Sequence, residues 1–340
     1  MILVLLKFIV CTVIIFFSGK RVAKYGDIIA EKTGLGGLWI GLVLVAVATS
    51  LPEIFTGVGS ILFVGAPDLT VGNLFGANTY NLLNLVLLDF LYRGGPLLSA
   101  ISAGQLLTAV LSLIPLLIAI TGIFLYKFFP ISFANISIFS FLILIIYLTS
   151  VRIIFQFEQG QQKILKELKK EEKEILKYEH ISFKKASIFY GLSAAVIVGA
   201  GIWLSYIGRD LAEILRLNQN FIGSLFLGFA TTLPEITVSV AALRLGAKEL
   251  AVANMFGSNL FNIVIIFLND ALYQKAPIFT AISQQHIFTG FVVILMTSIV
   301  CVGLILKPKK KTRLGLSNYA IGLITVFILG AYINFISGNR

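Results

Sequence analysis

The chain has 340 residues, of which 58% are hydrophobic and only 13% are charged, and its mean hydropathy is +0.95. This composition excludes a soluble globular domain and is typical of an integral membrane protein. The net charge of +11 does not indicate nucleic-acid binding, because the basic residues lie in short loops between apolar segments and no nucleic-acid-binding motif accompanies them.

Ten segments are apolar and long enough to cross a bilayer, which takes about 20 residues. We expect helices at 1–19, 37–63, 68–92, 104–126, 131–151, 187–207, 220–244, 249–271, 286–306 and 317–337. The first segment lacks a small-residue cleavage site before Gly19, so we interpret it as a retained helix and not as a signal peptide. Cys11 and Cys301 fall inside such segments and predict no disulfide. The expected fold is therefore all-α.

The basic residues divide unequally between the two sets of alternate loops. One set holds 21 of the 27 lysines and arginines and the other holds five. Because basic loops concentrate on the cytoplasmic side, we expect a multi-pass cell-membrane protein with both termini extracytoplasmic and with a cytoplasmic connector at 152–186. Residues 158–185 of this connector alternate Lys and Glu with apolar residues at helical spacing. That pattern fits a solvated linker or an amphipathic helix on the inner membrane face.

Two motifs occur twice. The motif at 41–53 ends in Ala-Thr-Ser-Leu-Pro-Glu and returns 182 positions later at 223–235, ending in Ala-Thr-Thr-Leu-Pro-Glu. The segment 72–81 likewise matches 253–262. Five helices per copy is an odd number, so the second copy must cross the membrane in the opposite direction. We therefore predict two inverted five-helix repeats, at 1–151 and 187–340, joined by the connector.

Each long motif places a proline and a glutamate inside an apolar stretch. Proline frees the carbonyl four residues earlier, and Glu53 shares a helix face with Thr49, as Glu235 does with Thr231. An all-oxygen set suits Ca²⁺ or Na⁺, and the lack of Cys, Met or His nearby argues against softer metals. Two carboxylates balance the charge of one Ca²⁺. A carboxylate at membrane depth indicates a functional site.

Other polar residues have structural alternatives. Four asparagines, Asn73, Asn78, Asn254 and Asn259, either line the site or bond neighbouring helices together, and Gly72, Gly76 and Gly257 permit close helix approach. Asp89 and Asp270 are expected to cap helices or anchor loops, and Asp68 to begin a helix. Neither His180 nor His286 is assigned a role.

At these paired motifs the chain resembles the sodium/calcium exchanger branch of the cation/calcium antiporter superfamily, whose two repeats carry a Thr-Ser-Leu-Pro-Glu motif followed by a Gly-Ser-Asn motif. The resemblance covers essentially the whole chain. It implies a calcium site of Thr49, Glu53, Thr231 and Glu235. It also implies flanking sodium sites from Ser50 and the Ala46 carbonyl in one half, and from Thr232, Ser258 and the Gly228 carbonyl in the other, with Asn81 and Asn262 bordering the centre.

The chain departs from the family pattern at three positions. Ala77 replaces the serine of the first Gly-Ser-Asn motif and removes a hydroxyl. Thr232 replaces a serine but keeps its hydroxyl, and Asn262 stands where similar exchangers often carry aspartate. The site then has at most two negative charges, so three sodium ions would leave it at +1, which is costly in a low-dielectric setting.

The leading hypothesis is a secondary antiporter that exchanges Ca²⁺ for Na⁺ by alternating access, with the first and sixth helices sliding against the bundle. Calcium/proton exchange is the nearest alternative, and a cation channel is a further one. An enzyme is not expected, since neither a nucleophile with its base nor a His-Glu-x-x-His motif occurs. No resident cofactor and no obligatory protein partner are expected besides the transported ions and the bilayer.

Overall fold

The computed structural model describes residues 1–32, 47, 49–102, 104–168 and 181–338. Over these residues the fold is helical, apart from a short antiparallel hairpin of β1 (Ser132–Phe133) and β2 (Ile136–Ser137). The longer helices are α1 (Ile2–Lys32), α4 (Pro67–Leu91), α5 (Gly104–Leu125), α6 (Ile138–Leu168), α7 (Phe183–Leu215), α11 (Lys248–Leu272), α12 (Gln285–Leu306) and α13 (Asn318–Gly338).

The shorter segments belong to two broken helices or to loops. One broken helix is α3 (Leu51–Val58), continued by the π-helical η1 (Gly59–Val64). The other runs through α8 (Gln219–Ile222), the π-helical η3 (Gly223–Leu227), α9 (Gly228–Thr231) and α10 (Leu233–Arg244). Two 3₁₀ turns, η2 (Leu97–Ala100) and η4 (Ile278–Thr280), lie in loops.

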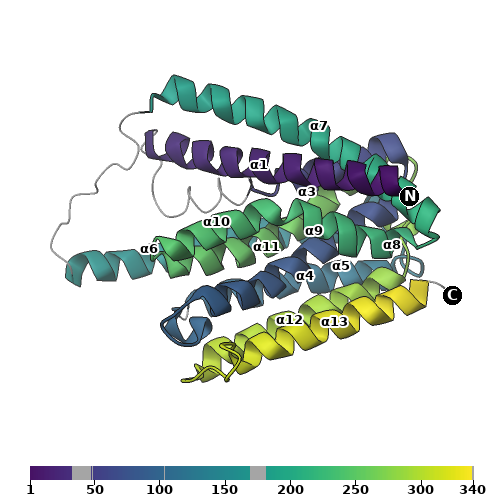
Figure 1. Ribbon diagram of the computed structural model, residues 1–340. Helices are drawn as coiled ribbons and strands as arrows, with labels where there is room; N and C mark the ends of the chain where they lie inside the picture. Colours follow the sequence, from purple (N-terminus) through teal and green to yellow (C-terminus); the bar gives the residue numbers. More distant parts are fainter. Residues whose placement is uncertain (33–46, 48, 103, 169–180, 339–340) are drawn as a thin grey trace.

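The helices form a layered bundle (Figure 1). Helices α1 and α7 lie side by side on one face, α12 and α13 cover the opposite face, and α4 and α11 run between these layers. The N and C labels stand at the same end of the bundle, whereas α6 ends and α7 begins at the other end. An even number of membrane crossings between the two ends of the chain accounts for this placement.

Within the described residues, eight helices are long and apolar enough to span a membrane, and the pair Gln219–Thr231 and Leu233–Arg244, bent by 41°, makes a ninth. The chain is therefore a multi-pass membrane protein. The first part of the expected span at 37–63, residues 37–46 and 48, lies outside the described ranges, and the described part includes the apolar stretch Leu51–Val64. The expected count of ten is thus neither reached nor overturned by the described residues.

Three expected helices have different bounds in the structure. Helix α1 does not end at residue 19 but continues to Lys32, and α7 extends well beyond 187–207 at both ends. Helix α6 begins at Ile138 and not at 131, because the β1–β2 hairpin precedes it, and it continues past residue 151 to Leu168. Hydropathy ends a segment where charged residues begin, yet Lys, Arg and Glu are good helix formers. The helices therefore run on beyond the apolar stretch, and part of the expected amphipathic connector helix is the end of α6.

Buried apolar side chains form two large, separate clusters. The larger unites α4, α5, α11, α12 and α13, with Phe75 and Phe256 among its fully buried members. The smaller joins α1 and α7 to the start of the second broken helix, with Ile15, Leu204 and Leu227 at its centre. The two broken helices lie between these layers, since α3 contacts both α7 and α4, and α10 contacts both α1 and α11.

Glycines allow α4 to lie very close to the second broken helix. A Cβ atom on Gly72 would stand 2.8 Å from the Asn220 carbonyl oxygen, and one on Gly228 would stand 2.8 Å from the Gly76 carbonyl carbon. A Cβ on Gly76 would overlap the Ser224 backbone. The close approach expected at Gly72 and Gly76 is confirmed.

Aspartates at the ends of α4 and α11 tie the two halves of the chain together. Asp89 accepts hydrogen bonds from the Leu97 amide at 2.8 Å, from the amide and hydroxyl of Ser317, and from Tyr319. Asp270 accepts from the Ile278 amide at 2.6 Å, from the Ser137 amide and from the Ser140 hydroxyl. Each carboxylate thus holds the start of the last helix of the other half, and the expected anchoring role is confirmed.

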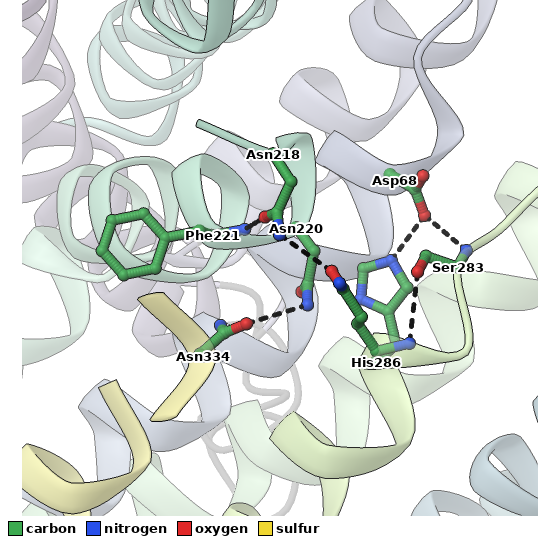
Figure 2. Close-up of polar contacts among 8 residues, drawn as sticks. Asp68, Asn218, Asn220, Phe221, Ser283, His286 and Asn334 are labelled. Carbon is green, nitrogen blue, oxygen red and sulfur yellow. Dashed lines mark hydrogen bonds and ion pairs between the residues drawn. The ribbon is translucent and has the colours of Figure 1, made fainter. Parts of the chain in front are cut away.

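A second pair of carboxylates lies at the starts of α4 and α11. Asp68, in the first turn of α4 as expected, accepts from the Ser283 amide at 2.7 Å and lies 2.8 Å from His286 Nε2 (Figure 2). Glu249, 181 positions after Asp68, accepts from the amide and hydroxyl of Ser102. Each carboxylate therefore holds a loop of the opposite half: Asp68 the loop before α12, and Glu249 the loop before α5.

Candidate functional site

Both Pro-Glu motifs interrupt their helix at the same position. Pro52 and Pro234 each lie in the first turn of a new helical segment, α3 or α10, where the amide that proline lacks would have no partner within the helix. The residue two before each proline leaves ideal helical geometry in the same way: Ser50 has φ −85° and ψ 9°, and Thr232 has φ −83° and ψ 0°. The repeated sequence thus creates two equivalent breaks, each followed by a glutamate in the first turn.

The two glutamates, Glu53 and Glu235, are fully buried. Ser50 donates to Glu235 Oε1 at 3.2 Å, and Ser258 approaches the same oxygen at 3.5 Å. Thr49 also contacts the Glu235 carboxyl group. Residues of both halves therefore surround Glu235, and the first motif supplies hydroxyls to the glutamate of the second.

Glu53 has a different environment. Thr231 lies beside its carboxyl group, but the Thr231 hydroxyl donates to Asn73 Oδ1 at 3.1 Å. Both Glu53 oxygens remain without a hydrogen-bond partner, as does Glu235 Oε2. Burying carboxylate oxygens without donors is strongly unfavourable. Three such oxygens in one buried region indicate a site that a cation completes.

Asparagines of α4 and α11 link the two halves through a reciprocal set of hydrogen bonds. Asn78 donates to the Asn259 carbonyl at 3.2 Å, and Asn259 donates to the Asn78 carbonyl at 3.3 Å. Asn81 donates to Asn259 Oδ1 and Asn262 donates to Asn78 Oδ1, each at 3.0 Å. Asn78 and Asn259 thus join the helices, while Asn81 and Asn262 each keep an unpartnered Oδ1.

The remaining predicted ligands fall into three groups. The Thr232 hydroxyl donates to the carbonyls of Gly228 at 2.8 Å and Phe229 at 3.2 Å, so both Thr232 and the Gly228 carbonyl are engaged within their own helix. Ser50 and Ser258 meet at Glu235, as described above. Ala46 lies outside the described residues, and so does Ala48, whose carbonyl Pro52 was expected to free.

Hard, oxygen-seeking cations fit this chemistry best. The unpartnered oxygens belong to two carboxylates and two amides, and hydroxyls of both motifs adjoin them. Ca²⁺ takes six to eight oxygen ligands and Na⁺ shares the preference for oxygen. In the part of the chain that the structure describes, no group of three or more His, Cys, Asp or Glu side chains could hold a metal ion.

The sequence did not predict two buried polar features near the glutamates. Asn254 donates to the Ser239 hydroxyl at 3.0 Å and to the Glu235 carbonyl at 3.3 Å. Asn269 is also fully buried, and neither polar atom of its side chain has a partner. Helical spacing along 254, 258, 262 and 269 could have pointed to both, because these residues lie near one face of α11.

The fold and the sequence both have known relatives. The chain is 26% identical over 270 residues to the inner membrane protein YrbG of Escherichia coli, an alignment that covers 79% of this chain and 80% of that protein. The structure of the H⁺/Ca²⁺ exchanger CAX is similar with a TM-score of 0.69 at 11% identity, over 99% of this chain and 85% of the other. The sodium-calcium exchanger NCX_Mj is similar with a TM-score of 0.58 at 18% identity, over 97% and 98%.

The family model described as sodium/calcium exchanger protein matches residues 3–163 and 185–338, which is nearly the whole chain. These two matched stretches contain both Pro-Glu motifs and both asparagine-rich segments. The chain belongs to the sodium/calcium exchanger family, a family of transporters and not of enzymes.

Proposed function

We propose that the protein is a secondary antiporter that exchanges Ca²⁺ for Na⁺ at a single buried site between Glu53 and Glu235. The observation that carries this proposal is the pairing of two fully buried carboxylates from equivalent helix breaks, with three of their four oxygens unpartnered. Two negative charges neutralise one Ca²⁺. Because Na⁺ would use the same carboxylates together with Ser50 and Ser258, the two ions exclude each other, and this exclusion couples their movements.

The architecture that we propose is two inverted five-helix repeats, 1–151 and 187–340, separated by a connector at 152–186. Corresponding helices begin about 181 positions apart, as Pro67 and Lys248 do for α4 and α11 and as Gly104 and Gln285 do for α5 and α12. Together with the basic loops, the shared end of the two termini supports a cell-membrane topology with the termini outside and the connector in the cytoplasm.

Alternating access would come from α1 and α7 moving across the two broken helices. Both helices contact the broken helices through glycines. A Cβ on Gly19 of α1 would overlap the Pro234 ring, and one on Gly201 of α7 would stand 2.9 Å from the Thr56 amide nitrogen. Outward-facing side chains of α1, such as Leu6 and Ile9, are exposed as lipid-facing residues are. Because these glycines have no side chains that interdigitate with the broken helices, the contact allows α1 and α7 to slide.

Calcium/proton exchange is the second candidate, favoured by one observation. Ala77 is fully buried at the position where the family motif has serine, so the first half lacks the hydroxyl that Ser258 contributes in the second. A sodium site without that oxygen is weaker, whereas a proton carried on a buried carboxylate does not require it.

The experiment that separates these candidates measures uptake of radioactive calcium into proteoliposomes under an imposed sodium gradient and, separately, under an imposed pH gradient. We expect uptake to follow the sodium gradient and to fall on the order of 100-fold in Glu53→Gln, the equivalent of about 3 kcal/mol. Glu213→Gln is the matched control, because its side chain is 71% exposed. Uptake driven by pH alone would favour proton exchange, and uptake needing neither gradient would indicate a channel.

A further inference from the structure

A polar strip continues from Glu53 along the first broken helix. Glu53, Gly57 and Ser60 share one helix face, being separated by four and three residues. Asn269 of α11 lies against the middle of this strip: a Cβ atom on Gly57 would stand 2.8 Å from Asn269 Nδ2 and 3.0 Å from Oδ1. Glycine at position 57 is therefore what makes room for the amide beside the helix.

The polar atoms of this strip are buried without partners. Thr56 Oγ1, Ser60 Oγ and both polar atoms of Asn269 have no hydrogen-bond partner, although all three side chains are 0% exposed. A buried group left unsatisfied carries the full penalty of its desolvation. Four unsatisfied atoms within two helical turns of Glu53 therefore need a hydrated species to offset their desolvation.

The corresponding place in the second half is apolar. The residue 181 positions before Asn269 is Leu88, which is 1% exposed, and the residue 182 positions after Ser60 is Ala242, which is 7% exposed. Both belong to the larger apolar cluster. Gly57 corresponds to Ser239, whose hydroxyl bonds to Asn254. Polar groups beside Glu235 therefore stop at Ser239 and Asn254, whose Oδ1 is unpartnered, and the next turn at Ala242 and Leu88 is apolar.

The strip leads from Glu53 toward the end of the bundle where the termini lie. Ser60 is followed by the turn at Ala66, and Ala66 packs in the same cluster as Val4 near the N-terminus. Ala242 and Leu88, in contrast, lie close to the opposite end, where α10 ends at Arg244 and α4 ends at Leu91.

From this asymmetry we infer that Thr56, Ser60 and Asn269 form an entry site for partly hydrated Ca²⁺ or Na⁺, which passes from the terminus-bearing end of the bundle to Glu53. The amide oxygen and the two hydroxyls replace part of the hydration shell of the cation before it reaches the carboxylates. The opposite route, past Leu88 and Ala242, lacks such ligands and opens only when helices move. This inference rests on the proposed exchange function for the identity of its cargo.

Cysteine accessibility tests the entry site without requiring transport. In a background with Cys11 and Cys301 replaced by alanine, single cysteines are introduced as Ser60→Cys and Asn269→Cys, with Ala242→Cys and Leu88→Cys as matched controls from the other half. A positively charged, water-soluble methanethiosulfonate is the probe. We expect the first pair to react at least tenfold faster than the second. Equal reactivity of the two pairs, or no reaction at position 269, would overturn the inference.

Flux measurements then test whether cations use this route. Asn269→Leu installs the counterpart residue, and we expect calcium exchange to fall about tenfold while thermal stability in detergent is kept, since an unsatisfied amide is removed. Asn269→Ser keeps an oxygen and should restore most of the rate. Unchanged flux in Asn269→Leu, despite a reactive Cys at 269, would overturn the route. A third result is possible: neither the wild-type protein nor any variant exchanges calcium, but the two cysteine pairs still react at different rates. The proposed exchange function then fails, and the hydrated entry site stands.

Discussion

The two halves of this molecule place the same glutamate in different surroundings. Glu235 has Ser50 and Ser258 at one of its oxygens, with Asn254 bound to Ser239 beside it. Glu53 has no donor at either oxygen, and the next turn of its helix faces unpartnered Asn269. The backbone breaks are nearly identical, so the difference comes from side chains alone. Two matching motifs thus form the site, and the residues on the neighbouring helices make its two sides unequal.

The same inequality appears in the contacts that hold the halves together. The Asp89 carboxylate accepts four hydrogen bonds, including one from Tyr319 at 2.5 Å, whereas the Asp270 carboxylate accepts three. Lys311 also donates hydrogen bonds to the backbone carbonyls of Asp89 and Tyr92. The junction at Asp89 is therefore the more heavily bonded of the two.

Breaking these junctions should produce the largest change in stability. We expect Asp89→Asn to lower the free energy of unfolding by about 3 kcal/mol and Asp270→Asn by about 2 kcal/mol, because an amide turns an NH₂ group toward donors that need an acceptor. Thermal unfolding in detergent measures the order of the two effects. Asp210→Asn is the control, since its carboxylate is 34% exposed and meets Arg209 at 3.7 Å, and such a pair contributes little. An equal loss in all three variants would contradict the comparison.

The repeated Pro-Glu motifs were enough to predict a paired buried site, because a carboxylate is costly at membrane depth and is rarely placed there without a functional role. Helical segments were also predictable from hydropathy, apart from ends such as Lys32 and Leu168, where charged residues continue a helix without a sequence signal. The cross-half contacts were not predictable in their particulars. Nothing in the sequence says that Asp89 bonds Ser317, or that Asn269 meets Gly57, because these pairs depend on how α3, α4, α11 and α13 lie in space.

The hydroxyls around Glu235 offer a way to sharpen the comparison between the two sides of the site. Ser258→Ala makes the second half match Ala77 of the first. We expect it to raise the sodium concentration for half-maximal calcium exchange about tenfold, the equivalent of about 1.4 kcal/mol. Sodium titration of calcium efflux from proteoliposomes at fixed pH measures this change.

The reciprocal substitution, Ala77→Ser, supplies the missing hydroxyl and should lower the half-maximal sodium concentration by a smaller factor, about threefold, since no other hydroxyl is bonded to the Glu53 carboxylate to share the ion. If Ser258→Ala left the sodium titration unchanged while altering the response to a pH gradient, these hydroxyls would act on proton exchange and not on sodium.

The smallest expected change in stability lies at the starts of α4 and α11. His286 contacts Asp68, whereas the residue 181 positions earlier, Gln105, is not bonded to Glu249, which binds Ser102 instead. His286→Gln should cost about 1 kcal/mol, because Asp68 keeps the Ser283 amide and loses one of two partners. Thermal unfolding measures this loss, with Gln105→His as the matched control. We expect no gain from that control, since Ser102 already bonds both Glu249 oxygens. If Gln105→His raised the stability by as much as His286→Gln lowers it, the contacts at Asp68 and at Glu249 would be interchangeable, and the comparison would be contradicted.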